Sequence, residues 1–388
     1  MYGKKHLVIT AICTAIIVWL VSSVYFLGFG GYDSGDTIMR AKRIIESVYV
    51  NPLTKEQETQ MTDLAITGMV YGLGDQYSRY LNTEDLDEYE ETKQENYKGI
   101  GVSVNFNGEE GTMTVVSPYD GSPAQKAGIL PGDILVQVGD IEVNTETYNS
   151  VLDYIKAGED ENIRLKILRG EEMLEFVVHR EEVKRQSVTH KMFHGGVGYI
   201  RVSEFIHNTT EDFVAAIAEL QERKMTALII DLRNNPGGYA DSVLKMTDSL
   251  LPKGVIAYLE DNQGKRQYFH SDAKCLELPM AVLINQGTAS ASELMAGSLQ
   301  AHGLATIIGE KSYGKAVGQA LYPITSKTAL YLTSARYFTP KGECIDKVGI
   351  EPDIKVSLDA SLIGQISLLE PEEDAQLLKA LEILQKTN

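Results

Sequence analysis

Apolar and charged positions come in blocks along the chain, and the first block is a long uncharged run. Leu7 to Leu27 carry no charge, and Lys4 and Lys5 stand just before them. As a helix this run spans about 31 Å, close to the hydrocarbon thickness of a bilayer. We therefore expect residues 1–31 to form an uncleaved, single-pass transmembrane anchor; a cleaved signal peptide and a buried core helix are the alternatives. The two lysines predict a cytoplasmic N-terminus, with the body of the protein outside the cell membrane.

Residues 32–95 follow a helical pattern and are rich in charge. In the first helical run the apolar positions recur at helical spacing: Ile38, Ala41, Ile44, Ile45 and Val48. A second helical run covers Gln57 to Tyr71, and Gly72 to Asp75 then interrupts the pattern. We predict a helical N-terminal arm that serves packing or dimerisation.

The pattern changes over residues 96–182 to short strands and glycine turns. A strand pattern at Gly99–Val104 precedes two turn-rich stretches, and an amphipathic helix pattern follows at Thr145–Lys156, with a further strand at Asn162–Leu168. The turn-rich stretches are Gly121–Ile129 and Pro131–Leu135. In this order the segments closely resemble a bacterial PDZ domain.

The PDZ resemblance implies that this region binds a peptide tail, because such domains add an extended peptide to a sheet edge. The backbone amides of Gly99, Ile100, Gly101 and Val102 would hold the terminal carboxylate. The peptide would lie between the following strand and the Thr145–Lys156 helix. The alternative is that these glycines only shape a turn.

Strands and helices alternate from residue 183 to residue 357. Ala227–Leu232 and Met280–Asn285 are continuous apolar stretches, as expected for strands that are buried on both faces. Thr210–Arg223 has a clear amphipathic helical pattern. Alternation of this kind predicts an α/β layered core. In residues 358–388, Leu362 to Gln385 is leucine-rich at helical spacing and is expected to join the arm in a dimer interface.

The predicted fold class is therefore multidomain α+β. It combines an N-terminal transmembrane helix, the helical arm, the PDZ domain, the α/β layered core and a C-terminal helical segment. The length of 388 residues agrees with more than one domain.

Composition excludes several classes of function. The formal charge is −18, and no basic block interleaved with aromatics occurs, so nucleic acid is not an expected partner. Neither Cys-x-x-Cys nor His-Glu-x-x-His is present, which argues against a structural zinc site and a zincin active site. We expect no metal and no cofactor. Cys275 and Cys344 can pair only if folding brings them together.

The candidate chemistry begins with a serine at a strand-to-helix junction. Ser290 follows the apolar strand and opens a predicted helix, where backbone amides point outward and favour negative charge. A nucleophile there gains an oxyanion site from its neighbour's amide. The alternative is structural, because Ser290-x-x-Glu293 is also a capping box.

Two further motifs make a case for the nucleophile. The first motif ends a buried strand in a glycine loop, with the sequence Asp231-Leu232-Arg233-Asn234-Asn235-Pro236-Gly237-Gly238. The second motif follows the candidate helix, with the sequence Gly309-Glu310-Lys311-Ser312-Tyr313-Gly314-Lys315-Ala316-Val317-Gly318-Gln319. With the Thr-Ala-Ser-Ala-Ser-Glu run, these motifs resemble the C-terminal processing peptidases, also called tail-specific proteases. The resemblance implies an active site of Ser290, Lys315 and Gln319. The family's usual glycine after the lysine is Ala316 here, which could restrict the loop's backbone.

The implied roles agree with general chemistry. Serine needs a base, and lysine can act as one only when it is neutral, which requires a pKa lowered by burial. The Gln319 amide would orient the amine without adding charge. The Ala291 amide, with one from Gly237 or Gly238, would hold the oxyanion.

Other candidates have structural interpretations. Ser292 is expected to pack within the first helical turn, and Lys311 to be a solvated loop residue. Ser312-x-x-Lys315 and Ser271-x-x-Lys274 match a penicillin-recognising pattern, but no Lys-Thr-Gly accompanies them. For Arg233, a salt bridge and a role near the active site remain equally open.

The sequence thus predicts a serine endopeptidase that captures C-terminal tails of protein substrates and cleaves them by a Ser-Lys(-Gln) mechanism outside the cytoplasmic membrane. It is expected to be a homodimer. The rival interpretation is a membrane-tethered, non-catalytic PDZ adaptor with a degenerate protease core.

Overall fold

The computed structural model describes residues 34–92, 96–107, 110–119, 121–157, 160–272, 274–359, 362, 366 and 369–387. The expected membrane anchor lies outside these residues. Among the helices that are described, none is both long and apolar enough to cross a membrane. The chain divides into two units, Met1–Leu73 and Gly74–Asn388.

The N-terminal unit contains two of the predicted arm helices. They are α2 (Ser34–Val48) and α3 (Lys55–Tyr71). Thr54 begins α3 with a capping box, in which its hydroxyl accepts from the Gln57 N–H and the Gln57 side chain accepts from the Thr54 N–H. Within this unit large apolar side chains remain exposed, among them Ile44, Val48, Leu64 and Met69.

The second unit, Gly74–Asn388, contains a small β-rich region. A five-strand path is formed by β3 (Val102–Asn107), β4 (Thr112–Pro118), β5 (Ile134–Val138), β7 (Asn162–Arg169) and β8 (Glu172–His179), and β6 (Ile141–Glu142) pairs with β5. Two further strands, β2 (Asn96–Gly99) and β9 (Glu181–Lys184), pair with each other, and the helices are α5 (Pro123–Ala127) and α6 (Tyr148–Ala157). Met113, Val115 and Ile163 are among the fully buried residues of its separate core. This arrangement agrees with the predicted PDZ region.

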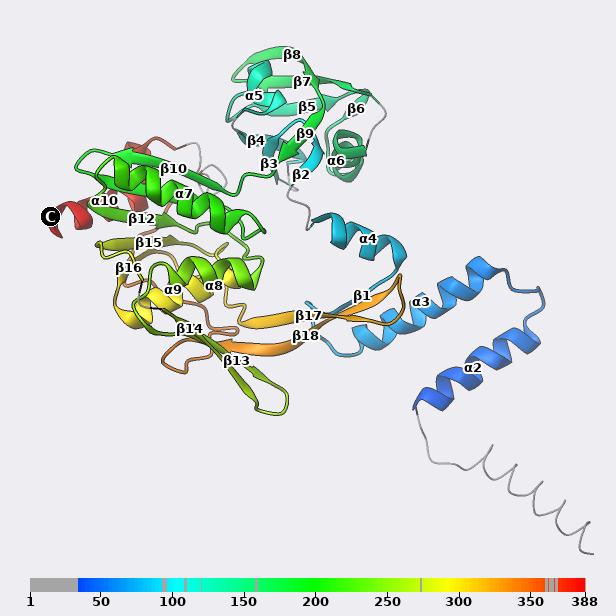
Figure 1. Ribbon diagram of the computed structural model, residues 1–388. Coiled ribbons are helices and arrows are strands. Elements are labelled where there is room, and N and C mark those ends of the chain that lie inside the picture. Colours follow the sequence, from blue (N-terminus) through cyan, green and yellow to red (C-terminus); the bar gives the residue numbers. More distant parts are fainter. Residues whose placement is uncertain are drawn as a thin grey trace, which may run out of the picture. The chain divides into compact units, whose positions relative to one another are not determined.

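A six-stranded sheet forms the centre of the α/β core (Figure 1). Its order is β10 (Val188–Phe193), β11 (Val197–Val202), β12 (Ala227–Asp231), β15 (Met280–Ile284), β16 (Ala305–Gly309) and β19 (Ile354–Lys355). β10 is antiparallel to β11, and the remaining pairs are parallel. The apolar runs predicted as doubly buried strands are β12 and β15, and all five residues of each are buried.

Helices cover both faces of this sheet. On one face lie α7 (Thr209–Glu222), α8 (Ala240–Asp248) and α9 (Ala291–His302), which contribute to the largest apolar cluster. On the other face α10 (Ala375–Thr387) buries Leu377, Ala380 and Leu384 against β11, β12, β15 and β16. The expectation that the C-terminal leucines form a dimer interface is therefore wrong for this face, because it packs on the sheet. The helix also begins later than Leu362, after the short 3-10 turn η2 (Pro371–Glu373).

A second sheet carries the segment after the candidate lysine. Its order is β1 (Arg79–Leu81), β18 (Ala329–Phe338), β13 (Gly254–Asp261) and β14 (Arg266–Ser271), with β17 (Val317–Pro323) also paired to β18. Helix α4 (Thr83–Thr92) follows β1. Cys275 and Cys344 are both free thiols in this fold.

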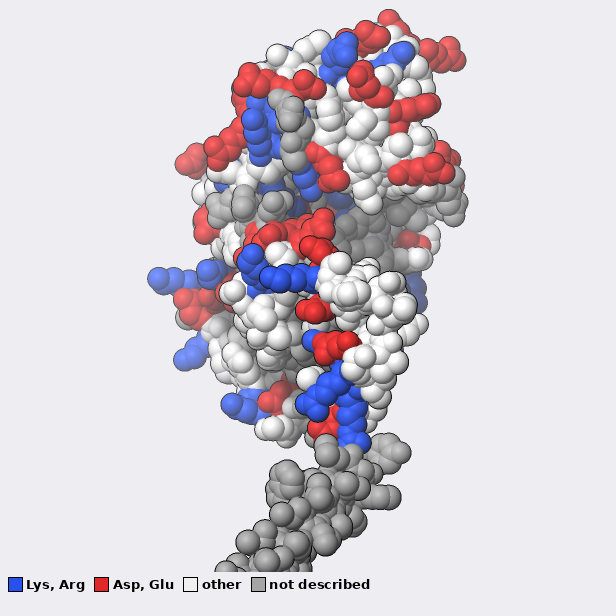
Figure 2. Space-filling model, turned by 90° about the vertical axis from the view of Figure 1, so that its right-hand side faces the viewer, with Lys and Arg blue, Asp and Glu red and all other residues white. Residues whose placement is uncertain are grey.

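Charge is dispersed on the face of the molecule drawn in Figure 2. There, Lys and Arg side chains are interspersed among Asp and Glu side chains.

Candidate active site

Ser290 occupies a strained turn between β15 and α9. Its backbone has φ 57° and ψ −118°, in a region that non-glycine residues seldom adopt. Such a conformation costs about 1–3 kcal/mol and persists only where the surroundings enforce it. The side chain is only half-buried. A strained serine at a strand-to-helix turn is one way in which proteins hold a nucleophilic hydroxyl exposed.

Glu293 connects the turn at Ser290 to the loop that contains Gly314 and Lys315. Its carboxylate is fully buried and accepts four hydrogen bonds. Oε2 accepts from the backbone N–H groups of Ser290 (2.9 Å) and Lys315 (2.8 Å). Oε1 accepts from the Gly314 N–H (2.7 Å) and the Ser312 hydroxyl (2.5 Å). The glutamate of the expected capping box therefore fixes Ser290 and Lys315 to a single carboxylate, which is more than a helix cap requires.

Tyr337 on β18 makes a second connection between the same two residues. Its buried hydroxyl lies 2.8 Å from the Ser290 carbonyl oxygen and 2.9 Å from the Lys315 carbonyl oxygen. Burial raises the pKa of Tyr337 well above its ordinary value, so the phenol keeps the proton with which it donates. Together, Glu293 and Tyr337 hold the backbones of Ser290 and Lys315 near each other from both sides.

Lys315 lies where burial lowers the pKa of its amine. Its side chain is half-buried, and within the described part of the chain no ion pair or hydrogen bond reaches its ammonium group. Burial lowers the pKa of Lys315, and the charge of Asp75 opposes that effect. The Tyr77 ring lies over the amine, with 4.5 Å between Nζ and the ring centroid.

The amide nitrogen of Gln319 is hydrogen-bonded to groups other than Lys315. Its Nε2 lies 3.3 Å from the Thr333 hydroxyl and 3.4 Å from the Val317 carbonyl oxygen. A shift in β17–β18 register between Gly318 and Gln319 accompanies this orientation. The structure thus brings Ser290 and Lys315 together, and it leaves the Gln319 amide engaged elsewhere.

The glycine loop lies directly against the serine turn. Gly237 has φ 104°, and a β-carbon there would lie 2.8 Å from Ser290 Cβ and 2.9 Å from the Ala291 nitrogen. Only glycine allows this approach. The Gly237 N–H donates to Asn235 Oδ1 (2.9 Å). By contrast, no hydrogen bond joins the Ala291 or Gly238 N–H to another residue that the structure describes.

Ala316 fits its position without strain. It is fully buried in the main apolar cluster. The non-glycine residues with positive φ in the described ranges are Lys224, Asn234, Ser290 and Lys347, so Ala316 has an ordinary backbone. The left-handed residue of this loop is Gly314, with φ 88°. The departure from the family pattern therefore does not distort the loop.

The rival residues have structural partners. Lys311 pairs with Glu351 at 2.9 Å. The Ser292 hydroxyl is buried and donates to the Asn235 carbonyl (3.0 Å). Ser271 donates to the Pro252 carbonyl (2.5 Å). Ser312 is committed to Glu293, as described above.

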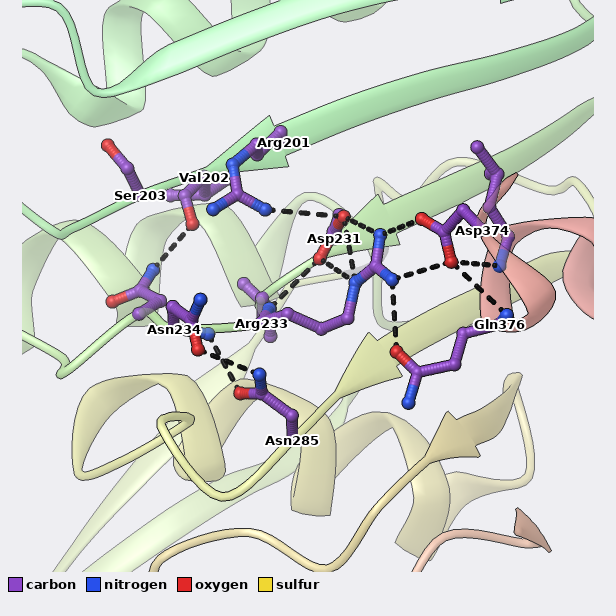
Figure 3. A network of polar contacts seen from close by, with 12 residues as sticks. Arg201, Val202, Ser203, Asp231, Arg233, Asn234, Asn285, Asp374 and Gln376 are labelled. Atoms are coloured by element: carbon purple, nitrogen blue, oxygen red, sulfur yellow. Dashed lines mark hydrogen bonds and ion pairs between the residues drawn. The ribbon is translucent and has the colours of Figure 1, made fainter. Parts of the chain in front are cut away.

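Arg233 supports the glycine loop from inside the core (Figure 3). Its side chain is fully buried between Asp231 and Asp374, and its Nη2 lies 2.6 Å and 2.7 Å from their carboxylates. Gln376 accepts a further bond from Nη1 (3.0 Å). Because Asp374 directly precedes α10 and Asp231 ends β12, the cluster connects the start of α10 to the end of β12. Of the two interpretations left open, the buried ion pair is the one observed.

The predicted carboxylate loop of the PDZ region is partly covered by its own chain. Ile100 is buried, Gly101 has φ 71°, and Val102 begins β3. A β-carbon at Gly99 would lie 2.4 Å from the Tyr97 ring. Burial raises the pKa of the Tyr97 hydroxyl, and hydrogen bonds from the Val102 and Gly101 N–H groups oppose the increase. Two of the four predicted amides thus face Tyr97.

Within the described ranges, no group of three or more His, Cys, Asp or Glu side chains could hold a metal ion.

Comparison with known proteins agrees with this geometry. The sequence profile of peptidase family S41 matches residues 196–356, and that of the PDZ domain matches residues 114–169. A carboxy-terminal-processing protease of Bartonella bacilliformis is 35% identical over 325 residues, which are 81% of this chain and 73% of that protein. The carboxy-terminal processing protease CtpB of Bacillus subtilis is 32% identical, over 87% of this chain and 71% of its own. Among solved structures, a photosystem II D1 C-terminal processing protease has a TM-score of 0.53 at 27% identity, covering 88% of this chain and 97% of that one.

The fold and site define a serine protease with a PDZ domain. The chain belongs to peptidase family S41, as a carboxy-terminal processing protease.

Three contributors to the site were not predicted from the sequence. Glu293 was identified only as a cap, and its bonds to the lysine loop depend on the fold. Tyr337 and Tyr77 had no local signal. Tyr77 lies just after Gly72–Asp75, a stretch that the sequence marks only as an interruption of the helical pattern.

Proposed function

We propose that this protease cleaves protein tails with Ser290 as the nucleophile and Lys315 as its general base. One observation carries this assignment: Glu293 and Tyr337 each bond to both residues, which fixes the strained serine next to a lysine that has no ion partner among the described residues. By contrast, Ser271, Ser292 and Ser312 are buried, and their hydroxyls donate to other groups.

The reaction follows from these roles. Neutral Lys315 takes the Ser290 hydroxyl proton as the oxygen attacks the scissile carbonyl. Collapse of the tetrahedral intermediate breaks the peptide C–N bond, and the lysine returns the proton to the leaving amine. Water, deprotonated by the same lysine, then hydrolyses the acyl-enzyme. Gln319 is proposed to orient the lysine amine, for which its amide would have to leave Thr333.

The Ala291 and Gly238 amides are proposed as the oxyanion hole. Both lie at the serine turn or its neighbouring loop, and neither N–H has a partner among the described residues. Gly237 remains a possible donor only if its bond to Asn235 breaks. The main role proposed for Gly237 is steric, because the absence of a β-carbon lets the loop approach Ser290.

Replacing Gly237 with alanine tests the approach of this loop. We expect kcat to fall about 10²–10³-fold, as for the loss of an oxyanion donor, because the new β-carbon would meet Ser290 and the Ala291 nitrogen. Gly264→Ala is the matched control, since Gly264 also has positive φ but no atom within 4 Å of a new β-carbon. Steady-state cleavage and thermal unfolding of both variants give the comparison. Equal activity of the two variants would contradict the assigned role of the loop.

The PDZ domain is proposed to capture substrates by their C-termini. Gly99 ends β2, Ile100 and Gly101 connect it to β3, and Val102 begins β3; the amides of these four residues would hold the terminal carboxylate. The tail would add to β3 beside α6. Because Tyr97 faces two of these amides, binding would require its hydroxyl to move aside.

We further propose an extracytoplasmic, membrane-anchored homodimer that needs no cofactor. The uncharged run at Leu7–Leu27 supports the anchor. The exposed apolar side chains of α2 and α3 support an association of the arms.

The dependence on a free C-terminus can be measured with two otherwise identical substrates. One is a flexible-tailed protein that ends in a carboxylate, and the other carries a C-terminal amide. We expect the full chain to cleave the carboxylate form with a higher kcat/KM, mainly through a lower KM, because the amide removes the charge that the loop binds. A short peptide ester that lacks a tail serves as the control for the catalytic centre. Equal kcat/KM for both tailed substrates would contradict capture by the PDZ domain.

A further inference from the structure

The segment Asp75–Ser78 is built as a rigid turn just before β1. The Asp75 carboxylate accepts from the Tyr77 N–H (3.2 Å) and from the Ser78 hydroxyl (2.5 Å). The Ser78 oxygen in turn accepts from the Thr333 N–H of β18 (3.0 Å). Pairing of β1 with β18 begins at the next residue, Arg79. The segment is therefore fixed to the sheet that carries the region after Lys315.

This turn places an aromatic face on the proposed base. The Tyr77 ring is half-buried, and its centroid lies 4.5 Å from Lys315 Nζ. The negative face of an aromatic ring attracts an ammonium group and favours its charged form. Tyr313 lies beside Tyr77, and burial together with this neighbour raises the pKa of Tyr77 to about 12. Tyr77 is thus a neutral ring at physiological pH, and it does not compete as an anion.

The charged and titratable groups around Lys315 come from several elements. Glu293 of α9 binds the Lys315 N–H, and Asp346 lies near the Ala316 N–H (3.4 Å). Tyr337 bonds to the Lys315 carbonyl. Of the acidic groups, Asp75 is the one whose charge acts on the Lys315 amine, where it opposes the effect of burial.

The same turn reaches the proposed orienting residue. Thr333, whose N–H binds Ser78, has its hydroxyl 3.3 Å from the Gln319 amide. A continuous chain of contacts therefore connects Asp75 through Ser78 and Thr333 to Gln319.

We propose that the Asp75–Ser78 turn is part of the active site, in which the Tyr77 ring seats the Lys315 side chain and stabilises its ammonium form. Tyr77 is a positioning residue that acts through Lys315. The inference rests on the proposed function for its effect on cleavage, whereas its effect on the Lys315 amine does not depend on cleavage.

The first test measures the amine itself. In the full chain carrying Ser290→Ala, the rate at which Lys315 reacts with acetic anhydride is followed against pH by mass spectrometry of its peptide. Tyr77→Leu keeps apolar cover but loses the ring face, so we expect the midpoint for Lys315 to move down by about half a pH unit. Asp75→Asn is expected to move it in the same direction, because it removes a negative charge. Tyr77→Phe keeps the ring and is expected to keep the midpoint.

The second test measures cleavage by the otherwise unchanged chain. Since the base must be neutral, the rising limb of kcat/KM should shift to lower pH in Tyr77→Leu, and the plateau should fall several-fold because Lys315 is less well seated. Tyr322→Leu, at a half-exposed position on β17, is the matched control. An unshifted Lys315 midpoint in Tyr77→Leu would overturn the proposal, even if activity falls. If the Lys315 midpoint shifts in Tyr77→Leu but the pH profile of kcat/KM does not change, Tyr77 contacts the lysine but Lys315 is not the base. This outcome separates the inference about Tyr77 from the proposed function.

Discussion

Lys315→Ala is expected to slow cleavage of a flexible-tailed protein by about 10²–10⁴-fold, the range typical of a lost general base. The serine would keep its strained position, but nothing nearby would take its proton. Cleavage by the unchanged chain should also rise with pH, because only neutral Lys315 accepts a proton. The limb should lie below the ordinary lysine value of about 10.4, since burial lowers the pKa of Lys315.

Lys311→Ala provides the control for this substitution. Lys311 stands four positions before Lys315, is about half-exposed and pairs with Glu351. Its loss should leave kcat nearly unchanged. Equal effects of the two substitutions would contradict the assignment of the base. A limb near pH 6.5 would indicate a histidine instead.

Arg233→Met is expected to destabilise the fold by about 3–5 kcal/mol, because it leaves the buried Asp374 carboxylate without Arg233 and leaves Asp231 with the more distant Arg201 (3.4 Å). Methionine retains most of the stem volume, so the loss is mainly one of charge. Chemical denaturation of the full chain, followed by far-ultraviolet circular dichroism, measures the change. Arg266→Met is the control, since the Arg266–Glu260 pair is largely exposed and should matter little. Similar midpoints for the two variants would contradict a supporting role for the buried cluster.

The cluster also predicts how stability depends on pH. Burial alone would raise the pKa of Asp231, but the charge of Arg233, followed by that of Arg201, outweighs it and holds the pKa well below the ordinary range. A group with a depressed native pKa contributes stability above its unfolded value, about 3.9, and loses it as the pH falls further. The unchanged chain should therefore lose stability steeply below about pH 4, and Arg233→Met should show a smaller loss, because Arg201 remains beside Asp231.

The sequence predicted the elements whose pattern is local. The strands β12 and β15 were evident because continuous apolar stretches identify positions that are buried on both faces. The proximity of Ser290 and Lys315 was predicted by the resemblance to a family, and the fold agrees with it. In contrast, the leucine pattern predicts a C-terminal helix from Leu362, whereas α10 begins at Ala375. The spacing of the leucines does not show that the short turn η2, Pro371–Glu373, precedes this helix.

Other features of the site depend on contacts between distant segments. The Gln319 amide turns toward Thr333, a partner that no local pattern indicates. Arg233 pairs with Asp374, which lies far away in the sequence. The motif around Arg233 therefore does not show whether the residue forms a salt bridge or has a catalytic role. Ala316 was the weakest point of the resemblance, and its ordinary backbone became evident only once Gly314 was seen to supply the left-handed turn.

Activation of Ser290 by Lys315 can be measured by the reaction of the serine with a fluorophosphonate. The full chain, Lys315→Ala, Lys311→Ala and Ser290→Ala are each incubated with the reagent, and the rate and site of labelling are determined by mass spectrometry. If Lys315 is the base, we expect a single label on Ser290, much slower labelling in Lys315→Ala, an unchanged rate in Lys311→Ala, and none in Ser290→Ala. Labelling at another serine, or an equal rate in Lys315→Ala and the unchanged chain, would contradict this activation.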